Sequence, residues 1–135
     1  MKSASLPLGV TLLPLGPSPG SLDVVASLGL RGAQLDAADP SMRPRDLGES
    51  ARRDLAAALR RRGLQASGID CFVPVDWFAQ SARVERAMDA VHGSLALAES
   101  LGRVAVCMHL PHEGAADVAL ALRDRKSTRL NSSHA

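Results

Sequence analysis

The chain has 135 residues, of which 46% are hydrophobic, so it is long and apolar enough to form the core of one ordinary domain. Its 16 Lys and Arg residues against 14 Asp and Glu leave a formal net charge of +2, which gives no support for nucleic-acid binding. No apolar run approaches the ~20 residues that a membrane-spanning helix needs, so a place within a membrane is not expected either.

The first apolar stretch predicts a β-strand over residues 8–13. Lys2 precedes this stretch, as in a signal peptide, but Pro7 and Pro14 interrupt it and no Ala-x-Ala cleavage site follows. A helix is expected over residues 21–28, with Gly29 as its stop. Its buried side should carry Val24, Val25 and Leu28.

Residues 32–36 predict a second strand, and a second helix follows from about residue 44 to residue 62, where Gly63 ends it. The buried side of that helix should hold residues at steps of three and four, namely Leu47, Ala51, Leu55, Ala58 and Leu59. A third strand lies within residues 64–73 and is bounded by Pro74.

A third helix is predicted over residues 79–101, with Gly102 as its end. Its buried stripe should consist of Val84, Ala87, Met88, Val91, Leu95 and Ala98. Residues 104–110 predict the fourth strand, and residues 115–123 begin a fourth helix. We expect Cys71 and Cys107 to be small buried apolar residues in a reducing, cytoplasmic compartment, since their spacing is not that of a disulfide framework.

This alternation predicts an α/β fold of four parallel βα units. A doubly wound open sheet and a closed (β/α)₈ barrel both use it. No glycine-rich phosphate-binding motif follows any strand, which removes the main reason to prefer the open sheet. Because a barrel needs about 250 residues, we expect residues 1–123 to be the truncated N-terminal half of a (β/α)₈ TIM barrel.

The C-terminal run over residues 124–134 (DRKSTRLNSSH) resembles the translation of a common sequencing adapter, residue for residue. We therefore expect residues 124–135 to be an artefactual, disordered tail. The tail contains Asp124, Arg125, Lys126 and Arg129, so 13 basic and 13 acidic residues stand before it and the charge excess disappears.

Three segments carry a resemblance to a known family: residues 28–36, residues 51–64 and residues 94–103. They are similar to the sugar phosphate isomerase/epimerase family, the xylose isomerase-like barrels, over about residues 8–110. The resemblance implies a parent enzyme that moves a proton next to the carbonyl of a sugar or sugar phosphate, with Mn²⁺ or Mg²⁺ as cofactor. In that family the metal ligands come mostly from later strands, so we assign no metal ligand or catalytic residue here and expect an inactive fragment without a cofactor.

In a barrel of this kind, the site lies at the C-terminal ends of the strands. Asp36 ends the second strand and could bind substrate hydroxyls, or it could help Asp39 to shape a turn. Asp70 lies in the third strand, where an unpaired buried carboxylate would be costly, so it could instead face the barrel mouth. Trp77 could stack on a sugar face or plug the helix packing.

His109, His112 and Glu113 end the fourth strand and have the chemistry of metal ligands, although lining of a substrate pocket is the alternative that we prefer. The candidate substrate-binding residues are therefore Asp36, Asp70, Trp77, His109, His112 and Glu113. Two rival functions stay open. One is an abasic-site endonuclease-like barrel, which would need a basic groove, and the other is a non-catalytic half-barrel that self-associates through unpaired edges.

Overall fold

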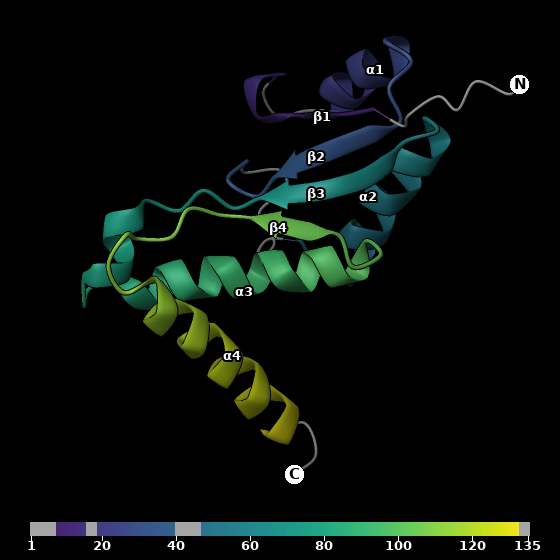
Figure 1. The fold of residues 1–135 in the computed structure, drawn as a ribbon. Coiled ribbons are helices and arrows are strands. Elements are labelled where there is room, and N and C mark those ends of the chain that lie inside the picture. The colour runs from purple at the N-terminus through teal and green to yellow at the C-terminus, as the bar shows by residue number, and fades with distance from the viewer. Residues whose placement is uncertain (1–7, 16–18, 40–46, 133–135) are drawn as a thin grey trace, which may run out of the picture.

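In the computed structural model, which describes residues 8–15, 19–39 and 47–132, a parallel sheet is packed against helices (Figure 1). In chain order the elements are β1 (Gly9–Thr11), η1 (Leu13–Leu15), α1 (Pro19–Ser27), β2 (Gly32–Asp36), α2 (Glu49–Arg61), β3 (Gln65–Asp70), η2 (Val75–Ala79), α3 (Val84–Ser100), β4 (Ala105–Cys107) and α4 (Ala115–Ser132). The predicted alternation of four strands with helices is therefore confirmed.

The four strands form one sheet in the order β1-β2-β3-β4, and each neighbouring pair is parallel. Val10 pairs with Ala33, and Ile69 pairs with both Leu35 and Val106. A register shift between β2 and β3 leaves Ser67 without an opposite residue. Each strand thus lies beside the next strand in the sequence, with no strand inserted between them, an arrangement compatible with half of a barrel.

Helices α1, α2 and α3 contribute to one core on one face of the sheet. Leu35 and Ile69 of the central strands are fully buried there. Helix side chains that complete this core are Leu22 and Val25 of α1, Leu59 of α2, and Leu97 and Ala98 of α3. Because α1, α2 and α3 pack on the same side chains of the sheet, none of them lies on the opposite face.

The helix stops predicted from glycine are confirmed. Gly29, Gly63 and Gly102 follow α1, α2 and α3, and their φ angles are 73°, 67° and 102°. Residues that carry a Cβ rarely adopt this left-handed backbone conformation, which glycine reaches without steric cost. The predicted start of the second helix near residue 44 lies outside the described residues, and α2 is described from Glu49.

Two of the predicted buried stripes need correction. Val24 of α1 is 46% exposed and Leu28, one residue past its end, is 67% exposed, whereas Leu22 and Val25 face the core. In α3, Leu95 is 44% exposed and Ser94 is fully buried instead. Hydrophobic spacing allowed either choice, since neighbouring positions on a helix differ by only about 100° and the packing partner decides between them.

A second core cluster lies where η2, the start of α3 and α4 meet. Its buried members are Cys71, Phe78, Ala87, Met88 and Val91. Val118 and Leu122 are the α4 residues that pack against it. Beyond these contacts, α4 extends away from the sheet as a separate rod (Figure 1).

Helix α4 continues to Ser132 and so crosses the predicted boundary after residue 123. The resemblance of residues 124–134 to a translated adapter belongs to their sequence, and their foreign origin stays a prediction.

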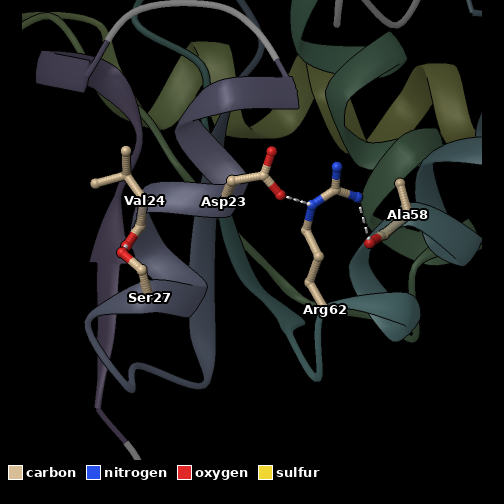
Figure 2. A network of polar contacts seen from close by, with 5 residues as sticks. All are labelled: Asp23, Val24, Ser27, Ala58 and Arg62. Carbon is tan, nitrogen blue, oxygen red and sulfur yellow. Dashed lines mark hydrogen bonds and ion pairs between the residues drawn. The ribbon is translucent and has the colours of Figure 1, made fainter.

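Helices α1 and α2 are also joined by a polar contact at the surface (Figure 2). The Nε of Arg62, just after α2, donates to Oδ1 of Asp23 in α1 at 2.6 Å. Its Nη1 donates to the carbonyl of Ala58 at 2.9 Å, a group that the end of α2 would otherwise leave without an intrahelical partner. In α1, the Ser27 hydroxyl likewise donates to the Val24 carbonyl at 2.7 Å.

Candidate functional site

The face of the sheet opposite the helices carries a polar cluster near the C-terminal ends of the strands. We call it the polar face and define it by Thr11 of β1, Gln34 of β2, Asp70 of β3 and Cys107 of β4. Strand alternation accounts for it, because each of these residues neighbours one that points toward the helices. All four strands therefore contribute one side chain to the same cluster.

Asp70 is the centre of this cluster. Its Oδ2 accepts a hydrogen bond from the Thr11 hydroxyl at 2.7 Å, and its Oδ1 accepts a hydrogen bond from the Gln34 amide. Only 3% of Asp70 is exposed. A buried carboxylate is costly unless it is hydrogen-bonded, and here β1 and β2 supply the donors.

Gln34 spans the width of the cluster. Besides its bond to Asp70, its Nε2 donates to the Cys107 sulfur at 3.7 Å, so that one amide reaches from β2 to β4. It crosses β3 at Gly68, where an added Cβ would lie 3.3 Å from the Gln34 Oε1 and 3.3 Å from the Ala105 carbonyl oxygen. Glycine at position 68 therefore provides the space in which the amide lies.

Asp36 pairs with Asp70 across the β2–β3 ladder and is half-buried. Its Oδ1 accepts a hydrogen bond from the backbone N–H of Ala38 at 2.9 Å, which is the pattern of an Asx turn. Of the two roles expected for Asp36, the contacts thus support the shaping of the turn after β2. The neighbouring Asp39, also expected to take part in this turn, is 7% exposed.

His109 lies two residues beyond Cys107 and stacks on Phe72, which lies two residues beyond Asp70. The ring centroids are 4.6 Å apart and the rings are inclined by 26°. Phe72 is 40% exposed and His109 is also exposed, so the pair presents aromatic surface to solvent past the ends of β3 and β4. The pair thus follows the two strands that carry Asp70 and Cys107.

Trp77 belongs to η2 and packs against the second core cluster. The guanidinium carbons of Arg83 and Arg86 lie 5.3 Å and 5.5 Å from its ring centroid, within the range of cation–π attraction. These contacts agree with Trp77 as a plug over the helix packing. They do not bring it to Asp70 or Gln34.

His112 and Glu113 are exposed in the loop before α4. Within residues 8–15, 19–39 and 47–132, no three His, Cys, Asp or Glu side chains come together in a group that could hold a metal ion. The structure thus brings Asp70 and its partners together, but it does not join His109, His112 and Glu113 into one centre.

The two cysteines differ in environment, and both are free thiols. Cys71 is 3% exposed, and burial raises the pKa of its thiol, with a smaller opposing effect from a hydrogen bond with Ser94. Cys107 is exposed, so the expectation that both thiols are buried is wrong for Cys107. The reason is that β4 is the last strand of the sheet and Cys107 points away from the helices.

Sequence reasoning missed Thr11 and Gln34 as candidate site residues. The available signal was the period-two pattern, in which Gln34 lies between the apolar Ala33 and Leu35 and Thr11 follows Val10. Polar residues at alternate positions near the ends of parallel strands mark the face that no helix covers.

Compared with protein-family models and with the sequences of curated proteins, the chain matches none. No helix among the described residues is long and apolar enough to cross a membrane.

Proposed function

We propose that this chain is the N-terminal half of a (β/α)₈ barrel of the sugar phosphate isomerase/epimerase type, and that its polar face binds the hydroxyl groups of a sugar. The observation that carries the proposal is the sequential strand order β1-β2-β3-β4 with polar side chains gathered on the helix-free face. In a closed barrel this face is the interior, and its end at the C-termini of the strands holds the active site.

The chemistry of the polar face supports a polyhydroxylated ligand. Gln34 and Thr11 provide amide and hydroxyl oxygens, and the buried Asp70 carboxylate holds both side chains in place. Sugar hydroxyls donate hydrogen bonds to such oxygens. Two residues beyond Asp70 and Cys107, the exposed Phe72–His109 pair adds ring surface, and ligand sites commonly combine such surface with a few polar groups.

The divalent metal implied by the family does not fit the described residues. Asp70 accepts hydrogen bonds from Thr11 and Gln34, and Asp36 accepts the turn N–H of Ala38. Among the described residues, no third ligand completes a metal group. We therefore propose that this chain binds sugar but does not isomerise it.

The abasic-site endonuclease alternative receives no support from the site. It requires a cluster of metal ligands on the early strands, which the described residues do not form. It also requires a basic groove, whereas the four strands contain no Lys or Arg.

Saturation-transfer NMR with D-fructose tests the proposed binding. We expect transfer from the wild-type chain to the sugar, and a clear loss of transfer for Gln34→Ala, with Gln65→Ala at the start of β3 as the matched control. Equal transfer in all three proteins, or none in the wild type, would contradict the proposal. In the same samples with Mn²⁺ or Mg²⁺, we expect no conversion of the ketose to an aldose.

Self-association is the second part of the proposal. Among the described residues, β1 and β4 each have a strand partner on one side only, which leaves a row of backbone donors and acceptors at both edges. We expect sedimentation equilibrium to give masses above the 14.1 kDa of one chain. A constant mass of one chain at all concentrations would contradict this part.

Two further expectations belong to the proposal. The free thiols of Cys71 and Cys107 support a cytoplasmic, reducing location. The predicted foreign origin of residues 124–134 is tested by sequencing genomic DNA across codon 124. If these residues are foreign, the genomic reading frame encodes different residues from position 124 onward.

A further inference from the structure

The hydrogen-bond donors of the polar face are already used within the cluster. Thr11 has one hydroxyl hydrogen, and it donates this hydrogen to Asp70. Gln34 has two amide hydrogens, and its nitrogen donates to Asp70 and to the Cys107 sulfur. What these side chains can still offer a ligand is therefore oxygen lone pairs, with the weak S–H donor of Cys107 as the exception.

The orientation of the Gln34 amide follows from Asp70. An amide oxygen facing the carboxylate would place two acceptors against each other, so the NH₂ group must point at Asp70. The Oε1 atom then lies above Gly68, where no side chain occupies the space. The amide is thus fixed with its acceptor available and its donors occupied.

The charge of the polar face also disfavours a ligand group that is negatively charged. None of the residues in β1, β2, β3 or β4 is Lys or Arg, while β2 and β3 each end in an aspartate, Asp36 and Asp70. A phosphate group brought to this face would meet like charge and acceptor atoms, and the four strands hold no Lys or Arg that would offset them.

We infer that the polar face is a hydrogen-bond acceptor surface that takes the neutral, hydroxyl-bearing part of a ligand and rejects phosphate. This inference rests on the proposed function for the identity of the ligand as a sugar. It adds that any phosphate on that sugar binds away from Thr11, Gln34 and Asp70.

Cys107 provides a direct test, because it is the exposed one of the two cysteines and accepts a hydrogen bond from Gln34. The wild-type chain is treated with limiting iodoacetamide, and alkylation of Cys107 and Cys71 is followed separately by peptide mass spectrometry. The reaction is run with D-fructose, with inorganic phosphate, and with sodium chloride at the ionic strength of the phosphate sample.

We expect fructose to slow alkylation of Cys107 saturably, by more than about threefold, as occupancy by mass action predicts. Phosphate should have no effect beyond that of chloride. Gln34→Ala should abolish the protection by fructose, whereas Gln65→Ala should retain it. The comparison of fructose with phosphate uses the unchanged chain, so it does not depend on how a variant folds.

The possible failures are distinguishable. Protection of Cys107 by phosphate as strong as that by fructose would overturn the inference and leave the proposed sugar binding intact. Protection by neither compound would overturn both. Protection by fructose that survives Gln34→Ala would place the sugar away from Gln34 and overturn both the inference and the proposed sugar site.

Discussion

The two faces of the sheet are made by the same strands and yet carry side chains of different chemistry. On the helix side, Leu35 and Ile69 are fully buried among apolar side chains. On the polar face, Gln34 and Asp70, each one residue away along the strand, form a hydrogen-bonded cluster with Thr11. The helix side holds the domain together, and the polar face holds its candidate site.

This difference gives a simple rule for reading substitutions in the chain. Changes on the helix side should act on stability through lost burial, while changes on the polar face should act through hydrogen bonds and ligand binding. The following variants are ordered by the size of their expected effect on the free energy of unfolding, so that each can break or sharpen the distinction.

Ile69→Ala should have the largest effect. Ile69 is fully buried in the helix-side core, and truncation of such a residue typically costs about 2–5 kcal/mol. Urea unfolding followed by circular dichroism measures the change. Val24→Ala is the matched control, since Val24 is 46% exposed and its truncation should cost less than about 0.5 kcal/mol. Equal losses in both variants would remove the distinction between core and surface.

Asp70→Ala should destabilise the chain by about 1–3 kcal/mol, because the Thr11 hydroxyl and the Gln34 amide would lose their acceptor. The same unfolding experiment measures it. Thr11→Val removes only one of the two bonds and should cost less. If Asp70→Ala were as stable as the wild type, the cluster would contribute nothing to folding.

Gly68→Ala should cost about 1 kcal/mol. The new Cβ would lie 3.3 Å from the Gln34 Oε1 and from the Ala105 carbonyl oxygen, so the amide would have to move. A thermal melt measures the loss of stability. Faster alkylation of Cys107 should accompany it, because the displaced amide would no longer cover that sulfur. An unchanged alkylation rate would show that Gln34 does not depend on this glycine.

Asp23→Asn should have the smallest effect. The Asp23 side chain is 64% exposed, and surface ion pairs of this kind contribute about 0.2–1 kcal/mol, less at high salt. Unfolding at low and high sodium chloride concentrations measures the loss. A loss as large as that of Ile69→Ala would mean that the link between α1 and α2 matters more than the core.

Much of the fold could be predicted from the sequence, because local signals agreed with the tertiary structure. The glycine stops after α1, α2 and α3 and the second strand at residues 32–36 are as expected. The choice of buried positions was less certain. Whether Leu95 or Ser94 faces the sheet depends on how α3 rotates against its neighbours, and spacing alone does not determine this rotation.

The candidate site was only partly predictable. Asp70 could be named as a buried carboxylate in a strand, but its partners Thr11 and Gln34 lie 59 and 36 residues away in the sequence. Pairing of such distant residues requires the strand order and register. The arrangement of His109, His112 and Glu113 could not be predicted for a related reason, since closeness in a loop does not fix the direction of side chains. Among the described residues, they form no group that could hold a metal ion.

The single unmatched residue of β3, Ser67, has a consequence for the shape of the sheet. Ala66 and Ile69 both contact the helix-side core although they are three positions apart, an odd spacing that would place them on opposite faces of a regular strand. The extra residue Ser67 keeps them on the same face. A strand that accommodates a bulge bends and twists more strongly than its neighbours. Removal of Ser67 would therefore keep every side chain on its present face but straighten β3, and the resulting flatter ribbon would be less suited to closing into a cylinder.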